Sequence, residues 1–195
     1  MDVSEAGSLQ PAELVAERIC HDLAGLAGTL SGALDMALDE HERPCEALSL
    51  ASEIALSLNA RLRLLRAAFG GGCGELTAAG IAELTPGLPG AERLTIICDA
   101  LEGSLDEIYA RALWLLLLLA ATAMPRGGRI EIAGRQGALA VRATAKACTW
   151  PAGLQTPVAA PLTPRAFPNW LLHYHLATHK ITIFTEEAMV WLRDG

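Results

Sequence analysis

The chain has 195 residues, of which 52% are hydrophobic, 19% are charged and only 5% are aromatic. This length suits one compact domain or two small ones that share a core, and the apolar content argues against disorder over most of the chain. The net charge of −7 argues against nucleic-acid binding, which requires an electropositive surface. The acidic N-terminus is unlike a signal peptide, and the most apolar run, residues 112–124, is too short to span a bilayer. We therefore expect a cytoplasmic protein with no membrane contact.

Residues 11–70 carry the pattern of two long helices joined by a polar turn at 39–44. In the first helix, apolar residues recur every three or four positions, and Pro11 suits the first turn. The apolar stripe of the second helix starts at Leu50. The sequence therefore predicts an N-terminal tail over residues 1–10, followed by a helical hairpin. Because an isolated hairpin leaves apolar faces uncovered, we expect a homodimer in which two hairpins form a four-helix bundle.

A glycine-rich hinge, Gly70–Gly74, separates the hairpin from a second region over residues 75–195 that mixes helices and strands. The expected elements are a helix over 75–84, a strand over 94–98, a helix over 104–124, paired strands over 129–132 and 138–145, a helix over 169–178, and strands over 181–184 and 189–192. A proline-rich loop occupies residues 151–168. The apolar run Trp114–Leu119 suits a buried core helix, with a partner-binding groove as the alternative. The predicted fold class is α+β.

His21 lies on the first helix, about 200° from the centre of its apolar stripe, so its imidazole should point to solvent. Gly25, Gly28 and Gly32 lie on the same side, and three glycines within a helix cost about 2–3 kcal/mol relative to alanine. Their missing side chains would let a partner protein approach the ring. Asp22 follows directly and can orient the imidazole, as carboxylates beside catalytic histidines do. The alternative is an ordinary exposed histidine in a glycine-rich chain.

Four arginines gather near the level of this histidine. They are Arg18, one turn before it, and Arg61, Arg63 and Arg66 on the antiparallel second helix. A guanidinium cluster beside a histidine suits a transferred phosphoryl group, whose charge must be neutralised in transit. The alternative is a solvated face on which the arginines pair with Glu13 and Glu17.

The stretch RICHDL at 18–23, with a second helix that ends in RAAFG at 66–70, resembles the histidine phosphotransferases of the ChpT family. The resemblance implies a dimerisation and phosphoacceptor hairpin in a dimeric four-helix bundle. It also implies that a small α/β sandwich follows, resembling a degenerate ATP-binding domain of a histidine kinase. His21 would then be the phosphoacceptor, supported by Asp22 and Arg18, and the glycines and the arginines of the second helix would dock the partner.

The second region lacks the residues with which such a kinase domain binds ATP. Residues 125–130 match the kinase Pro-x-Gly-Gly turn and thereby place the kinase asparagines at Leu115 and Leu119, which cannot ligate magnesium. Residues 146–151 stand where an Asp-x-Gly-x-Gly loop is expected. Residues 167–172 replace the glycine-rich loop that cradles phosphate. We therefore expect that the chain binds no ATP.

The resemblance implies a multi-step phosphorelay in which a phosphoryl group moves between receiver-domain aspartates through a phosphohistidine. The donor would be the receiver domain of a hybrid histidine kinase, and the acceptors would be response-regulator receivers. The partner receiver would bring magnesium, so the chain itself would bind no cofactor, no metal and no nucleic acid. Two alternatives remain at this point: a non-catalytic dimeric adaptor that docks receivers, and an active ATP-dependent histidine kinase.

Two further groups of residues could bind metal or form covalent links. The five cysteines, at positions 20, 45, 73, 98 and 148, form no C-x-x-C pair, so we expect buried free thiols rather than a zinc site or a disulfide framework. His173, His175 and His179 could form a metal site, because two of them are four residues apart on an expected helix. No acidic residue or cysteine lies near them, which favours ordinary polar residues on a surface helix.

Overall fold

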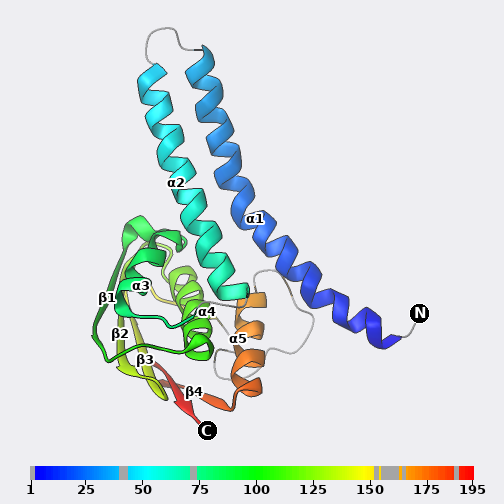
Figure 1. Cartoon of the computed structure of the whole chain (residues 1–195), viewed down its shortest axis with the longest axis vertical. Coiled ribbons are helices and arrows are strands. Elements are labelled where there is room, and N and C mark those ends of the chain that lie inside the picture. Colours follow the sequence, from blue (N-terminus) through cyan, green and yellow to red (C-terminus); the bar gives the residue numbers. More distant parts are fainter. Residues whose placement is uncertain are drawn as a thin grey trace.

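The computed structural model describes residues 3–39, 44–70, 74–151, 154, 163, 166–186 and 189–195. A long helical hairpin projects from an α/β body (Figure 1). The helices are α1 (Val3–Asp39), α2 (Pro44–Phe69), α3 (Ala78–Leu84), α4 (Glu107–Ala123) and α5 (Phe167–Thr178), with short 3₁₀ turns η1 (Thr85–Gly87) and η2 (Ala91–Arg93). The strands are β1 (Leu94–Leu101), β2 (Gly128–Arg135), β3 (Ala138–Thr144), β4 (Ile181–Glu186) and β5 (Met189–Asp194). None of the described helices is long and apolar enough to cross a membrane.

The first helix is longer than predicted. α1 spans 37 residues and begins at Val3, so the prediction of an N-terminal tail over residues 1–10 is wrong from Val3 onward. Pro11 lies inside this helix and not in its first turn. The turn predicted between the helices falls on residues 40–43, which are outside the described part of the chain.

The outer half of the hairpin has only a small core of its own. Leu30, Ala33, Ala51 and Ile54 pack between α1 and α2. Near the body, α2 joins a much larger core, in which Leu64 is fully buried. Arg111 of α4 donates hydrogen bonds from Nε and Nη2 to the last carbonyl groups of α2, at 3.3 and 3.2 Å. A cation at a helix C-terminus is favourable, so α4 anchors the base of the hairpin.

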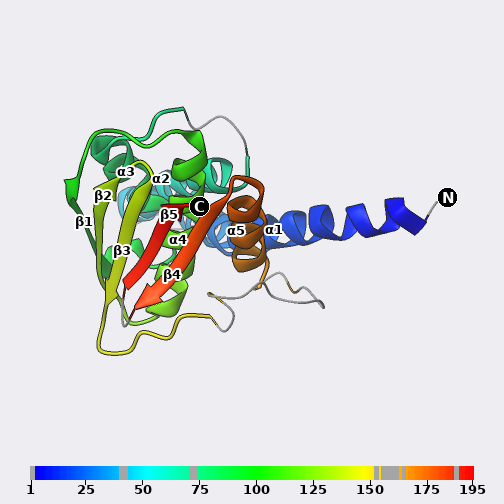
Figure 2. The same ribbon diagram turned by 90° about the horizontal axis from the view of Figure 1, so that it is seen from below.

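The body contains a five-stranded sheet in the order β1-β2-β3-β5-β4. β1 and β2 are parallel, and the other neighbouring pairs are antiparallel. The helices α4 and α5 cover one face of the sheet, on the side of the hairpin (Figure 2). All five predicted strands are present, and β1 extends beyond its predicted end to Leu101. The fold is therefore α+β, as predicted. The middle of the predicted hinge and most of the proline-rich loop are outside the described residues.

The central element of the body is α4, whose apolar run is buried as a core helix. It begins at Glu107, three residues after the predicted start at 104. Asp106 caps it by accepting a hydrogen bond from the Tyr109 backbone N–H at 2.9 Å. Every residue from Trp114 to Leu119 is at most 4% exposed. The run is thus core, and not a partner-binding groove. After α4 the chain turns at Gly127, whose φ of +83° disfavours other residues.

Candidate functional site

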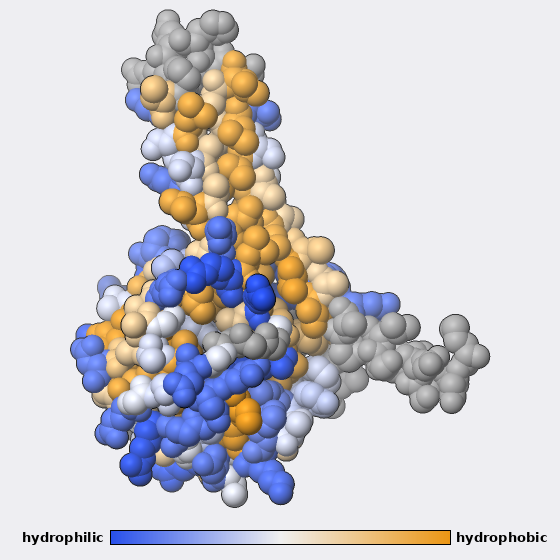
Figure 3. Space-filling view, viewed as in Figure 1, coloured by the Kyte–Doolittle hydropathy of each residue, from blue (hydrophilic) through white to orange (hydrophobic). Residues whose placement is uncertain are grey.

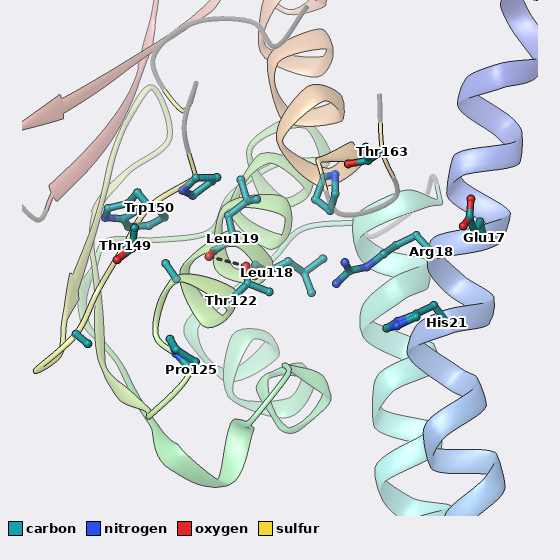
Figure 4. A pocket seen from close by; sticks show the side chains of 14 residues that line it. Glu17, Arg18, His21, Leu118, Leu119, Thr122, Pro125, Thr149, Trp150 and Thr163 are labelled. Atoms are coloured by element: carbon teal, nitrogen blue, oxygen red, sulfur yellow. Dashed lines mark hydrogen bonds between the residues drawn. The ribbon is translucent and has the colours of Figure 1, made fainter. Parts of the chain in front are cut away.

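The site is centred on His21, whose side chain is 82% exposed on α1. It lies on the part of α1 that passes beside the α/β body, and its ring points toward α4 across an open space (Figure 4). The helical phase predicted this exposure, because His21 is on the opposite side of the helix from the apolar stripe. An exposed imidazole on a rigid helix can be reached by another protein.

Asp22 connects His21 to Arg18. One carboxylate oxygen, Oδ1, lies 3.5 Å from His21 Nδ1, and the other, Oδ2, accepts a hydrogen bond from Arg18 Nε at 3.1 Å. The side chains of Arg18 and Asp22 are only 13% and 11% exposed, so the pair is largely sheltered from water. A carboxylate near Nδ1 favours the tautomer with the proton on that nitrogen. Nε2 then carries the lone pair and can act as a nucleophile.

The three arginines predicted on α2 have different surroundings. Arg61 is partly buried, and the charges of Asp22 and Arg18 act on its guanidinium. Burial lowers its pKa, an effect that the Asp22 carboxylate opposes and the Arg18 charge reinforces. Arg63 instead forms an ion pair with Glu83 of α3. Arg66 is exposed near the end of α2. The structure thus brings Arg61 to the His21 site and directs Arg63 to the body, and not to Glu13 or Glu17.

The predicted glycines leave a bare surface on α1 beyond His21. Gly25, Gly28 and Gly32 are exposed, and a Cβ atom built on any of them would meet nothing within 4 Å. No neighbouring group in the described part of the chain therefore requires a glycine at these positions. The described residues therefore show no contact that offsets the free energy that these glycines cost the helix.

A cleft of about 870 Å³ separates His21 from the body. Its walls are formed by Glu17, Arg18 and His21 on α1, by Leu118, Leu119, Thr122, Ala123 and Pro125 at the end of α4, by Ala147, Thr149, Trp150 and Pro151, and by Thr163 and Pro168. Figure 4 shows Arg18 and His21 directed into it from one side, with Leu118 and Thr122 opposite. The sequence gives no signal of this cleft, because its two walls are about a hundred residues apart in the chain.

The positions that a kinase would use for ATP are apolar here. Leu115 is fully buried in the core, and Leu119 is 4% exposed on the cleft wall. Thr149 donates its backbone N–H to the Ala123 carbonyl at 2.9 Å, which holds segment 146–151 against the end of α4. At the start of α5, Phe167 is buried. Two leucine side chains at these positions offer no oxygen for magnesium.

Of the three histidines at 173, 175 and 179, one differs from the prediction of ordinary surface residues, whereas His179 is exposed as predicted. His175 is buried, at 7% exposed, and its Nε2–H donates to the Ile108 carbonyl at 2.8 Å. Its ring lies 4.7 Å from that of His179. Within the described residues, no group of three or more His, Cys, Asp and Glu side chains could hold a metal ion. The predicted burial of the thiols is also wrong for Cys20 and Cys45, which are exposed.

Comparison with known proteins places the chain among phosphotransfer proteins. Residues 79–187, more than half of the chain, match the family model of the histidine phosphotransferase C-terminal domain. The chain therefore belongs to the histidine phosphotransferase family. This confirms the predicted resemblance and gives the chain a phosphorelay role in signal transduction.

One solved structure shows the same fold as this chain. A bacterial phosphotransferase determined at 1.7 Å matches 94% of this chain and 95% of its own, with a TM-score of 0.74 and 19% sequence identity. The Acinetobacter baumannii histidine kinase AdeS matches 89% of this chain and 97% of its own, with a TM-score of 0.37 and 13% identity. No curated protein sequence matches the chain.

Proposed function

We propose that the chain shuttles a phosphoryl group between receiver-domain aspartates through a phosphohistidine on His21. The observation that carries this proposal is the Arg18–Asp22–His21 arrangement, in which an exposed imidazole is oriented by a sheltered carboxylate. The open cleft beside it gives a receiver room to approach. Family membership supports phosphotransfer in general, and this geometry supports His21 as the acceptor.

The chemistry follows from the positions of the two ring nitrogens. His21 Nε2 attacks the phosphorus of the receiver's aspartyl phosphate in line with the P–O bond. The P–N bond forms as the P–O bond breaks, and the aspartate leaves as a carboxylate. Nδ1 keeps its proton, and Asp22 stabilises the positive charge that the ring acquires. Arg18 neutralises charge on the moving phosphoryl group. A second receiver aspartate reverses these steps.

The chain itself supplies no ATP site in this proposal. Magnesium belongs to the receiver, whose carboxylates hold it, and the body of this chain acts as a scaffold. The buried Leu115 and the cleft-lining Leu119 support this view, because neither can hold a nucleotide-bound metal ion. An ATP-dependent histidine kinase is therefore disfavoured.

Substitution of the acceptor tests the proposal. His21→Ala should abolish acid-labile labelling from a phosphorylated receiver. It should shift stability by no more than about 0.5 kcal/mol, because the replaced side chain is exposed. Labelling is followed by intact-mass spectrometry, and stability by thermal melting. Label that persists in the variant would contradict the role of His21.

Two further arms of this experiment separate the rival functions. A non-catalytic adaptor would bind receivers while the wild-type chain stayed unlabelled. A histidine kinase would become labelled from ATP and magnesium with no receiver present. We expect label when a phosphorylated receiver is added, and none from ATP and magnesium without a receiver.

We further propose that the active form is a homodimer. Figure 3 shows an apolar band along the hairpin, from near its outer end toward the body. Several large apolar side chains of the hairpin are exposed. They are Leu34, Met36 and Leu38 on α1, and Leu48, Leu50, Leu56 and Leu62 on α2. Exposed apolar patches of this kind mark interfaces, and a second hairpin would cover this one in a four-helix bundle.

The receivers are proposed to be that of a hybrid histidine kinase as donor and those of response regulators as acceptors. The net charge of −7 disfavours nucleic acid as a direct ligand, so any effect on DNA would pass through a regulator. A cytoplasmic location would fit these partners. Phosphotransfer profiling against the receiver domains of the source genome would identify the cognate pairs.

A further inference from the structure

We propose that Arg61 is a positioning residue for phosphotransfer: it takes over the Asp22 carboxylate when Arg18 turns to the phosphoryl group on His21. This inference rests on the proposed function. It gives Arg61 a role within the chain, in place of the predicted role in docking a partner.

Arg61 is held in an unusual environment. Its Nε and Nη1 atoms are both buried, and neither has a hydrogen-bond partner among the residues that the structure describes. Buried donors without acceptors are costly, and in native proteins such groups call for an explanation. The charges nearest to this guanidinium are those of Asp22, Arg18 and Glu92, each of which affects its pKa. Arg61 therefore has unused N–H donors near the Asp22 carboxylate, which accepts a hydrogen bond from Arg18 in this structure.

Arg18 is placed between the Asp22 carboxylate and the cleft in which a phosphoryl group on His21 would lie. Its Nε donates to Asp22 Oδ2 at 3.1 Å, while the side chain lines the same cleft as His21. A phosphoryl group brings about two negative charges and strong acceptor oxygens, which attract a guanidinium. If Arg18 turned toward it, the Asp22 carboxylate, only 11% exposed, would lose its partner. Arg61 supplies the replacement from the other helix.

The charges at the site fit this exchange. Asp22, Glu92 and the cleft-lining Glu17 already place negative charge near the two guanidinium groups. A phosphoryl group on His21 adds about two more negative charges. The positive charges of both Arg18 and Arg61 therefore favour the phosphorylated state.

The α/β body fixes α2 at the level of Arg61. η1 packs so closely against α2 that a Cβ on Gly87 would lie 2.3 Å from the Ala60 carbonyl oxygen and 2.8 Å from Leu64 Cβ. Ala60 directly precedes Arg61. Glu92 of η2 adds a negative charge near the guanidinium. The body therefore sets the position of Arg61 as well as forming the far wall of the cleft.

The test uses phosphoramidate, a small phosphoryl donor that needs no docking surface. Arg61→Met keeps the length of the side chain and removes its charge and donors. We expect labelling of His21 by phosphoramidate to slow at least tenfold, with an unchanged or higher melting temperature, because an unpaired buried charge is removed. Arg61→Lys, which keeps the charge, should recover part of the rate. Arg129→Met, at an exposed arginine on β2, is the matched control and should label like the wild type.

A double-mutant cycle shows whether Arg61 acts through Asp22. In an Asp22→Asn background, Arg61→Met should cause no further loss of rate. The inference would be overturned if Arg61→Met slowed labelling by the same factor in the wild-type and Asp22→Asn backgrounds. It would also be overturned if Arg61→Met alone were labelled within twofold of the wild-type rate. If Arg61→Met melts well below the wild type, the same cycle is run with Arg61→Gln. If Arg61→Met slowed labelling from a phosphorylated receiver but not from phosphoramidate, Arg61 would act in docking the receiver, and the inference would be wrong. A wild-type chain that takes no label from either donor would instead overturn the proposed function.

Discussion

At the scale of single residues, the three glycines beyond His21 point to contacts outside the chain. Most of the other glycines either have a positive φ or would clash if a Cβ were added, whereas Gly25, Gly28 and Gly32 have open space around them. Each costs the helix about 1 kcal/mol relative to alanine. A chain that gains nothing internally from this cost is best explained by a partner that packs against bare backbone.

Gly28 gives a prediction in which stability and activity change in opposite directions. Gly28→Leu should raise the free energy of unfolding by up to about 1 kcal/mol, because leucine is a good helix former and the site is open. The same change should slow transfer from a phosphorylated receiver at least tenfold, because the side chain would hold the receiver away from His21. Phosphoramidate labelling should stay unchanged. A wild-type rate with the receiver would contradict docking at this surface.

The same scale shows why the candidate site was only partly predictable. The sequence predicts that Arg61 and Arg63 lie near His21 because of their distance from the hairpin turn. That distance fixes the level of a residue along α2, but not the side of the helix on which its side chain lies. Residues two apart on a helix point about 200° away from each other, so only one of them can face Asp22. Arg61 does so, and Arg63 reaches Glu83 instead. Helical phase did predict the exposure of His21, because that depends on one helix alone.

At the scale of elements, local patterns predicted most of the fold. The unbroken apolar run of α4 favoured a buried core helix over a partner-binding groove, and Pro125 marked its end. The start of α1 was missed, because Pro11 suits a first turn and yet lies within the helix. The cleft was missed because it depends on how α1, the end of α4 and residues 147–151 pack together. Such long-range packing leaves no periodic signal in any one segment.

The contact between α4 and α5 predicts a pH dependence of stability. Burial lowers the pKa of His175, and the nearby His179 and Arg111 lower it further. The hydrogen bond from Nε2–H to the Ile108 carbonyl and the charge of Asp106 act in the opposite direction. The folded chain therefore favours the neutral ring, and the unfolded chain binds a proton more readily. Stability from this group is complete above the unfolded pKa of about 6.5 and falls as the pH drops below it.

His175→Gln should reduce this dependence. Between pH 7.5 and 5.5 the wild-type melting temperature should fall by more than that of the variant, because the other titrating groups are common to both proteins. The measurement is thermal unfolding followed by circular dichroism at several pH values. If the melting temperatures of the two proteins fell equally over this pH range, the pKa of His175 would not differ between the folded and unfolded chains, which would contradict the prediction.

At the scale of the whole molecule, burial is divided unevenly. The body and the base of α2 share one large core, whereas the outer hairpin has a core of three buried residues with Leu30 against them. On α2, Leu48, Leu56 and Leu62 lie within an arc of about 120° at about 100° per residue. Leu56 is 69% exposed. A hairpin with so little internal core and so much exposed leucine is best stabilised by a second copy.

The homodimer is tested by charging this surface. Leu56→Glu with Leu62→Glu keeps good helix formers but places carboxylates where the second hairpin would pack, so the chain should sediment as a monomer. Phe184→Glu, at a 49% exposed aromatic on β4, is the matched control and should leave the oligomeric state unchanged. A doubly charged variant that still sediments as a dimer would place the interface elsewhere. Because Arg18, Asp22, His21 and Arg61 all belong to one hairpin, the monomer should still accept phosphate from phosphoramidate, which separates assembly from chemistry.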